Sequence, residues 1–533
     1  MKTFTQLESE RVALQELCDT AKTQGERNRL GQFATPPALA LDILKLAKRM
    51  IRTSGKVHFL DPAFGTGSFF SALLSAFPAG QIGGAVGFEI DRHYGDKSRS
   101  LWGETQLDLR ITDFTKAPPP EDREKFDLVV CNPPYVRHHH LTALEKGRLR
   151  QLTRGLSGLR LSGLTGLYCY FLILADAWAS DDAVCVWLIP SEFMDVNYGV
   201  AVKEYLLTRV TLLQVHRFEA QDVQFGDAIV SSSVVCFRKA PPPANHVVDF
   251  TFGGSLNDPK SLRKTPLASL RPESKWNGRS SPPAADFQDA KLSDIFEIKR
   301  GLATGDNSFF ILTQAKIKEH RLPMKFLRPI LPSPRYLPLD EIQADQNGYP
   351  AIDRQLFLLD CDLPEEELQD RYPALWHYLE LGKRTVANGY LCKSRSPWYS
   401  QEKRPESLFL CTYMGRSRGK RCAAFRFILN HSKATAANVY LMLYPKADLR
   451  RALEGKPELA GEIWKRLNAI PPNTVEGEGR VYGGGLHKVE PRELGNVPAK
   501  SIADLANITV RKRPVQLELH PIDQEAQHLE FAT

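Results

Sequence analysis

The amino-acid sequence predicts an α/β fold in its N-terminal half, followed by a second domain of mixed α+β structure. Up to about residue 240, short apolar segments of strand length alternate with amphipathic helical segments. Strands that alternate with helices are typical of a mostly parallel sheet covered by helices on both faces. The chain has 533 residues, more than one ordinary domain needs.

The elements of the first half follow from apolar runs bounded by turn residues. We expect strands at residues 57–60, 85–88, 109–112, 127–131, 183–189, 211–218 and 234–237. We expect helices at residues 36–50, after a candidate N-cap at Thr35, and at 68–77 and 168–178.

The alternation stops at three prolines, residues 241–243, where a stretch rich in Pro, Ser and Lys begins. The sequence therefore predicts four parts. They are a helical extension at 1–28, the α/β domain at 29–240, a linker at 241–288 and a second domain at 289–533.

Composition excludes several classes of protein. The first residues are polar and acidic, so no signal peptide is expected. The most apolar run, residues 167–179, contains Asp176 and is too short to cross a bilayer. Nine scattered cysteines without a CxxC pair predict neither a disulfide framework nor a zinc site, and a reduced, cytoplasmic setting is expected.

The positive charge is confined to the second half. Residues 1–250 hold 28 Lys/Arg and 28 Asp/Glu, whereas residues 251–533 hold 42 and 34. Within that half, residues 393–433 carry ten basic and two acidic residues. Such a local field favours a polyanion as partner, although from charge alone a solvated basic surface is an equal alternative.

A glycine turn follows the first expected strand and opens a helix. It reads Asp-Pro-Ala-Phe-Gly-Thr-Gly-Ser-Phe over residues 61–69. Its glycines let the backbone approach a ligand, and the helix N-terminus offers free N–H groups. The turn lacks GxGxxG and GK[ST], so it is not the phosphate-binding pattern. A tight turn without a ligand is the alternative.

The next two strands also end in residues suited to a nucleotide. Glu89 is placed to accept hydrogen bonds from ribose hydroxyls. Asp113 offers an acceptor to an adenine amino group, and Phe114 offers a ring to the adenine face. A single strand-end carboxylate is more simply a solvated one, but three successive strand ends of these types together predict a nucleotide-like cofactor.

The most specific motif is Asn132-Pro133-Pro134-Tyr135, directly after the expected strand at 127–131. It resembles the Asn/Asp-Pro-Pro-Tyr/Phe motif of the amino-methylating class I methyltransferases. The whole set is similar to the gamma subgroup of adenine-N6 DNA methyltransferases, such as the TaqI and PstI modification methylases. Residues 31–36, Gly-Gln-Phe-Ala-Thr-Pro, resemble that subgroup's opening motif, and Phe225 resembles its later aromatic that faces the target base.

This resemblance implies a Rossmann-like methyltransferase domain at 29–240 and a DNA target-recognition domain at 289–533. It implies transfer of a methyl group from S-adenosyl-L-methionine to the N6 amino group of an adenine flipped out of double-stranded DNA, in a restriction–modification system. No metal is implied. The residues expected to bind the cofactor are Thr35, Asp61, Ala63, Gly65, Gly67, Glu89, Asp113, Phe114 and Pro134.

The chemistry explains the catalytic motif. An adenine amino group is a poor nucleophile because its electron pair is delocalised into the ring. The side-chain carbonyl of Asn132 and the backbone carbonyl of Pro133 can accept both N–H groups and free that pair. Tyr135 and Phe225 can stack on the flipped base, each for roughly 1–3 kcal/mol. The expected catalysis is positioning and electrostatic stabilisation.

Further residues are expected to contact DNA. Arg137 precedes three consecutive histidines, which cannot easily all face one ion and have no other ligand at the right spacing, so no metal site is expected. In the second half, basic residues interleaved with aromatics suit phosphate contacts and base reading. The alternative is a basic surface with two core aromatics. The expected DNA contacts there are Arg395, Trp398, Arg404, Arg416, Arg418 and Arg421.

Residues 301–307 and 484–491 resemble segments of related recognition domains less specifically. Four alternatives share some of these features: a protein glutamine methyltransferase of the release-factor type, an RNA adenine methyltransferase, a non-catalytic DNA-specificity protein and a fused nuclease. The first lacks the opening motif and the long basic second domain. We expect a monomer that acts on DNA, with a possible separate restriction endonuclease and no membrane partner.

Overall fold

The computed structural model describes residues 3–52, 55–219, 224, 231–276, 290–416, 423–482 and 485–508. The chain forms two compact units. The first comprises residues 1–280 with 415–424 and 479–488, and the second comprises 281–414, 425–478 and 489–533. Among the described residues, no helix is long and apolar enough to cross a membrane.

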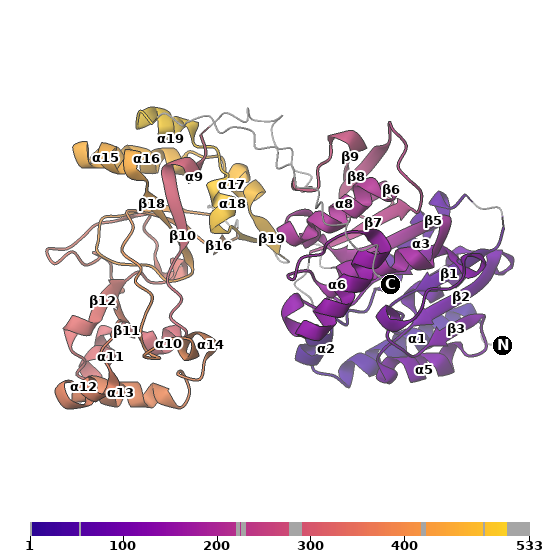
Figure 1. The fold of residues 1–533 in the computed structure, drawn as a ribbon, viewed down its shortest axis with the longest axis horizontal. Coiled ribbons are helices and arrows are strands. Elements are labelled where there is room, and N and C mark those ends of the chain that lie inside the picture. The colour runs from indigo at the N-terminus through magenta and orange to yellow at the C-terminus, as the bar shows by residue number, and fades with distance from the viewer. Residues whose placement is uncertain are drawn as a thin grey trace, which may run out of the picture. The chain divides into compact units, whose positions relative to one another are not determined.

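The first unit is built on a nine-stranded sheet in the order β3-β2-β1-β4-β5-β7-β6-β8-β9 (Figure 1). The first five strands in that order are parallel, and β7 runs antiparallel to both of its neighbours. The strands are β1 (Val57–Asp61), β2 (Ile82–Phe88), β3 (Leu107–Arg110), β4 (Phe126–Cys131), β5 (Ala179–Pro190), β6 (Thr211–Arg217), β7 (Ser232–Arg238), β8 (Val247–Gly254) and β9 (Pro259–Pro266).

Capping boxes mark the N-termini of several α-helices in this unit. Thr3 and Gln6 form a capping box at the first helix, and Thr142 and Glu145 form one at the sixth. The helices are α1 (Phe4–Thr20), α2 (Gln24–Leu30), α3 (Pro37–Met50), α4 (Ser68–Ala76), α5 (Arg92–Trp102), α6 (Ala143–Ser157), α7 (Leu167–Leu174) and α8 (Val200–Thr208).

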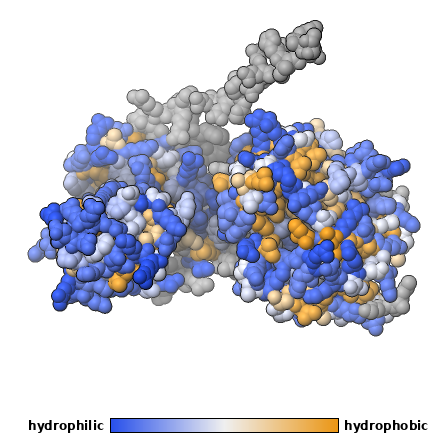
Figure 2. Space-filling model, turned by 60° about the horizontal axis from the view of Figure 1, so that its bottom comes forward, coloured by the Kyte–Doolittle hydropathy of each residue, from blue (hydrophilic) through white to orange (hydrophobic). Residues whose placement is uncertain are grey.

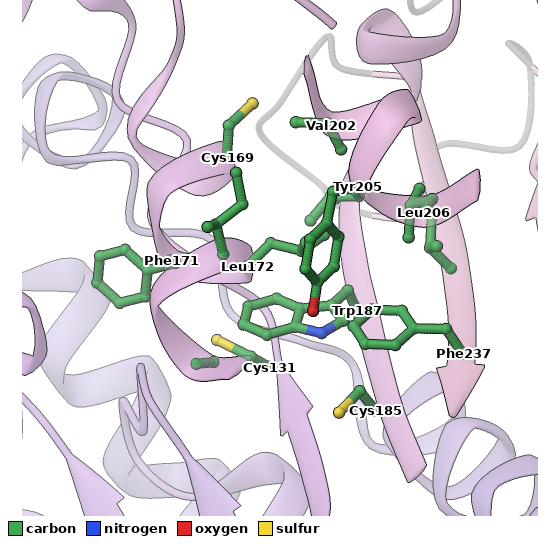
Figure 3. Close-up of a cluster of buried hydrophobic side chains, with 14 of the residues drawn as sticks. Cys131, Cys169, Phe171, Leu172, Cys185, Trp187, Val202, Tyr205, Leu206 and Phe237 are labelled. Carbon is green, nitrogen blue, oxygen red and sulfur yellow. The ribbon is translucent and has the colours of Figure 1, made fainter. Parts of the chain in front are cut away.

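Both faces of this sheet are buried, as a parallel sheet requires. In β4, Val129 and Cys131 join one hydrophobic cluster, whereas Leu128 and Val130 join the other. This alternation follows from the two-residue period of a strand. Figure 3 shows the first cluster, where Trp187 of β5 lies among side chains of α7 and α8. The expected α/β architecture is confirmed.

The expected linker at 241–288 is wrong for its described residues. β8 and β9 extend the sheet beyond β6, and Trp276 is 2% exposed in the same core. Three prolines follow the end of β7, and such a run predicts a break between domains. However, Val248 and Phe250 then alternate inward along a new strand that pairs in parallel with β6.

The second unit has mixed α+β structure, as expected. A five-stranded sheet has the order β10-β18-β15-β17-β13, and a three-stranded sheet has the order β11-β14-β12. These strands are β10 (Phe296–Arg300), β11 (Ile311–Thr313), β12 (Leu327–Ile330), β13 (Glu341–Ile342), β14 (Leu356–Leu359), β15 (Phe409–Thr412), β17 (Phe427–Asn430) and β18 (Tyr440–Pro445). The strands β19 (Arg480–Tyr482) and β20 (Leu486–Lys488), which form a further small sheet with β16 (Met414–Gly415), belong to the first unit.

Short helices flank these sheets. They are α9 (Leu292–Ile295), α10 (Asn307–Phe310), α11 (Gln314–Glu319), α12 (Glu365–Arg371), α13 (Pro373–Lys383), α14 (Tyr390–Lys393), α15 (Ala447–Gly455), α16 (Leu459–Asn468), α17 (Pro472–Glu478), α18 (Pro491–Gly495) and α19 (Lys500–Leu505). Separate hydrophobic clusters lie around β14 and around β17 and β18, so the unit has cores of its own.

Candidate active site

The residues singled out in the first half lie at one edge of the nine-stranded sheet. Asp61 ends β1, Glu89 follows β2, Asp113 lies just beyond β3 and Asn132 follows β4. These strands are parallel neighbours, so their carboxyl ends meet at the same edge. The strand order reverses between β1 and β4, and ligands of open α/β sheets bind at such a switch point.

The glycine turn uses its two glycines differently. Both have left-handed φ angles, +58° at Gly65 and +90° at Gly67. A Cβ on Gly67 would lie 2.6 Å from the ring of Phe64, so this glycine is required by packing. A Cβ on Gly65 would meet nothing within 4 Å, so open space adjoins the turn there.

Glu89 ties the turn to the next loop. Its Oε2 accepts a hydrogen bond from Gly65 N at 2.9 Å and its Oε1 accepts one from Asp91 N at 2.7 Å. Burial raises the pKa of Glu89 to about 6, against the lowering effect of these N–H groups. A carboxylate has further lone pairs, so this side chain can still accept hydrogen bonds from a ribose.

Asp61 is 1% exposed, and one of its oxygens lacks a partner. Oδ1 accepts a hydrogen bond from Ala63 N at 3.1 Å, whereas Oδ2 has none among the described residues. Burial raises the pKa of Asp61 to about 8. Because buried polar atoms are normally hydrogen-bonded, Oδ2 together with the open space at Gly65 fits a ligand that forms a hydrogen bond at this turn.

Asp113 and Phe114 are more engaged than the sequence suggested. Asp113 Oδ1 accepts hydrogen bonds from the N and Oγ1 of Thr115 at 2.9 and 2.8 Å. Phe114 is 3% exposed, and its ring lies 5.3 Å from those of Phe88 and Trp178. Phe114 is therefore part of the core, and its contact with an adenine face stays a prediction.

The side chain of Asn132 is held in one orientation. Its Nδ2 donates to the backbone carbonyl of Phe33 at 2.8 Å and to Thr35 Oγ1 at 3.1 Å. Its Oδ1 is buried and has no hydrogen-bond donor among the described residues. Since the backbone carbonyl of Phe33 can only accept, its contact fixes which end of the amide is the nitrogen. The site therefore presents an unused carbonyl oxygen at the end of β4.

The opening motif at residues 31–36 lies directly against the catalytic motif. Tyr135 N donates to Gly31 O at 3.2 Å, and a Cβ on Gly31 would lie 2.3 Å from Tyr135 N. The Tyr135 hydroxyl donates to Leu188 O at 3.0 Å, and its ring lies 5.5 Å from that of Phe33. We call residues 31–36 the strap, because they fasten residues 132–135.

Helix α1 contributes residues that sequence reasoning missed. Arg11, 2% exposed, pairs with Glu8 at 2.7 Å and donates to Ser68 Oγ at 2.9 Å, at the start of α4. Thr66 Oγ1 donates to Gln15 Oε1 at 2.6 Å. The expected extension at 1–28 is thus attached to the glycine turn. An arginine in a polar helix gives no sequence signal of burial.

The expected DNA contacts are only partly described. Phe225, Arg418 and Arg421 lie outside the described residues. Arg137 and Arg416 are exposed, and their contact with DNA stays a prediction. Among the described residues no group of three or more potential ligands could hold a metal ion.

Three other expected contacts pack within the second unit. Arg395 donates to the carbonyls of Ala303 and Thr304 at 2.6 and 2.7 Å. Trp398 packs with aromatic rings of α10, and Arg404 pairs with a neighbouring glutamate. These contacts give the three side chains structural roles, and DNA contact by them stays a prediction.

The sheet and this edge define a class I methyltransferase, an enzyme that uses S-adenosylmethionine. The model of the Eco57I restriction-modification methylase matches residues 88–224. The model of the C-terminal domain of the type II methyltransferase M.Eco57I matches residues 284–526.

Two relatives resemble the chain over most of its length. The type II methyltransferase M.AccI of Acinetobacter calcoaceticus is 26% identical over 488 residues, 88% of this chain and 85% of the relative. The type II methyltransferase M.XamI of Xanthomonas campestris pv. amaranthicola is 27% identical over 492 residues, 90% of this chain and 86% of the relative. The chain is therefore similar to type II methyltransferases of restriction–modification systems over most of its length.

Two solved structures share the fold. The type IIL restriction-modification enzyme MmeI, solved in complex with DNA, superposes with a TM-score of 0.56 at 14% identity, over 84% of this chain and 67% of that one. The cryoEM structure of the DrdV–DNA complex gives 0.54 at 12% identity, over 94% of this chain and 59% of that one. The chain therefore spans little more than half of DrdV.

Proposed function

We propose that this chain methylates the N6 amino group of an adenine flipped out of duplex DNA, as the modification enzyme of a restriction–modification system of the gamma subgroup. The observation that carries this proposal is the buried Asn132 Oδ1, an acceptor without a donor directly after β4. The type II methyltransferases among its relatives support DNA as the substrate.

The proposed chemistry uses two carbonyl groups. One amino N–H donates to Asn132 Oδ1 and the other to the backbone carbonyl of Pro133. This pairing favours a more tetrahedral nitrogen, whose electron pair becomes available for attack. S-adenosylmethionine would supply an electrophilic methyl group, whose bond to sulfur breaks as its bond to nitrogen forms, so that S-adenosylhomocysteine leaves. The proton that the nitrogen loses passes to solvent, because no strong base is needed once the nitrogen is methylated. Most of the catalytic effect then comes from fixed geometry.

The cofactor is proposed to lie along the ends of β1, β2 and β3. Gly65 and Gly67 shape the turn, Asp61 offers Oδ2, and Glu89 accepts from the ribose. The other proposed contacts are Thr35, Ala63, Asp113, Phe114 and Pro134.

The target base is proposed to stack on Tyr135 and Phe225. Flipping costs a few kcal/mol, and stacking contacts of roughly 1–3 kcal/mol each offset it. The Tyr135 ring is already fixed by its hydroxyl and by Phe33, so little side-chain entropy is lost when a base binds.

The first test removes the unused acceptor. Asn132→Ala should lose methyl transfer to duplex DNA, while S-adenosylmethionine binding measured by calorimetry stays near the wild-type value. Asn257→Ala is the matched control, because that side chain is exposed and bonds to Asp42 within the same unit. Substantial turnover by Asn132→Ala would sink the assignment.

The second test identifies the product. The chain is expressed in a host without DNA methylation, and modified bases are mapped across the genome. We expect N6-methyladenine at one short recurring sequence. Methylated cytosine, or a genome without modification while a purified protein or RNA substrate is methylated, would contradict the proposal.

A further inference from the structure

One end of the second unit carries an unusual run of residues, 381–396, between α13 and the loop after α14. It contains four basic residues and no acidic one. Figure 1 shows α10, α13 and α14 gathered at this end of the unit. Five exposed residues of this run, which we call the α14 surface, are Leu381, Arg384, Tyr390, Leu391 and Lys393. Lys383 is exposed as well, but it is paired with Glu365 and Glu380 at 2.9 Å.

The α14 surface exposes apolar and aromatic side chains that the core does not use. Tyr390 is 88% exposed and Leu381 is 63% exposed. Figure 2 shows one face of this unit, and most of its described surface there is hydrophilic. A tyrosine combines a flat apolar ring with a hydroxyl, and such residues are enriched where a protein meets a partner.

The cations of this surface are free to meet a partner. Arg384 and Lys393 are both exposed, and among the described residues neither has a carboxylate within ion-pair distance. Some basic residues of the unit are already paired, as Lys403 is with Asp360, and Arg426 donates to Asp340 at 2.6 Å. Other exposed cations of the unit, such as Lys433 and Lys456, also have no ion pair among the described residues. The α14 surface is therefore distinguished by its exposed aromatic and apolar side chains together with cations, and not by charge alone.

The backbone beneath this surface is fixed. Gly305 has a φ of +96°, and a Cβ there would lie 2.7 Å from the sulfur of Cys392, which is fully buried in α14. Arg395 holds the carbonyls of Ala303 and Thr304, just before that glycine. The loop at 301–307 thus packs against α14 and holds the backbone that carries Tyr390 in place.

We propose that the α14 surface is the part of the second unit that reads duplex DNA, an inference that rests on the proposed function. Arg384 and Lys393 hold phosphates, and Tyr390 contacts a base. An exposed ring with an exposed cation on either side of it in the chain matches a duplex, which offers negative charge on its backbone and flat apolar surface at its bases.

The test separates the two kinds of contact. DNA affinity is measured against salt concentration for the full chain, on the duplex found by genome mapping and on a scrambled duplex. Lys393→Ala and Arg384→Ala should each lower the affinity for both duplexes to the same extent. Each should also reduce the slope of log affinity against log salt concentration by about one. Tyr390→Ala should lower the affinity for the mapped duplex about 10-fold without a change in the salt slope, and Tyr390→Phe should keep the wild-type affinity.

Matched controls lie elsewhere in the unit. Lys456 is exposed near α15, and Tyr336 is 51% exposed against Arg354. Lys456→Ala and Tyr336→Ala should behave as wild type. Wild-type affinity, slope and preference in all α14-surface variants would overturn this inference, as would a change in oligomeric state without a change in DNA binding. A wild-type chain that binds no duplex would instead refute the proposed function.

Discussion

The orientation of Asn132 gives a prediction whose size follows from two hydrogen bonds. Thr35→Val keeps the shape of a side chain that is almost fully buried, but removes the hydroxyl that accepts from Asn132 Nδ2 at 3.1 Å. The bond from Nδ2 to Phe33 O at 2.8 Å remains. One of the two hydrogen bonds that hold the Asn132 amide in place is therefore lost.

A hydrogen bond of this kind contributes about 0.5–1.5 kcal/mol net. Each 1.36 kcal/mol corresponds to a tenfold change in rate, so we expect the kcat of Thr35→Val to fall by roughly 2- to 12-fold. Thr35→Ser retains the hydroxyl and should keep most of the wild-type rate. Base flipping depends on other residues, so the fluorescence of 2-aminopurine at the target position should be the same in all three proteins.

The assay is single-turnover methylation of the mapped duplex at saturating cofactor, with S-adenosylmethionine affinity measured separately by calorimetry. Equal rates for Thr35→Val and Thr35→Ser would refute the reasoning. A weaker cofactor affinity at an unchanged rate would show instead that Thr35 binds the cofactor, which is the role that the family resemblance implies.

Two further predictions concern residues beside the glycine turn, one for cofactor affinity and one for stability. Burial raises the pKa of Glu89 to about 6, so its carboxylate is lost as pH falls through that value, and S-adenosylmethionine affinity measured by calorimetry should weaken from about pH 8 to about pH 5. Glu89→Gln should bind weakly at every pH, and a wild-type pH profile in that variant would contradict the ribose contact. Arg11→Met leaves Glu8 without its cation, and should cost roughly 2 kcal/mol in chemical denaturation, less than the ~3–5 kcal/mol of a fully buried pair because the Glu8 side chain is 24% exposed. Arg29→Met, at an exposed position of α2, is the control. Equal free energies of unfolding in both variants would show that Arg11 does not stabilise the fold.

The first half was predictable because its strands are buried on both faces. Runs such as residues 127–131 and 183–189 have no polar alternation, and they became β4 and β5 nearly as expected. The candidate site was visible for a related reason: its polar residues directly follow those strands. Helix α5, by contrast, was not expected, because its sequence from Arg92 to Trp102 is mostly polar.

Other features leave no mark on a single sequence. The partner of Asn132 is a backbone carbonyl 99 residues earlier, and any residue other than proline at position 33 offers the same group. Arg11 is buried by a contact with residues more than 50 positions away. The second unit was not derivable, because several of its strands have only two to four residues, as in Glu341–Ile342, too few to show a period.

The strap connects the two halves of the proposed site. On one side, Phe33 O and Thr35 Oγ1 orient Asn132. On the other side, Gln32 Nε2 donates to Asp91 Oδ2 at 2.8 Å, and the N–H of Asp91 is bound by Glu89. Hydrogen bonds through Gln32 therefore link the loop around Glu89 to the strap, and the strap in turn holds the amide of Asn132. Residues 31–36 thus lie against residues 132–135 in space, and the same six residues contact both Asn132 and the loop around Asp91. A substitution at Gln32 is therefore expected to affect both proposed functions of the site, cofactor binding and methyl transfer.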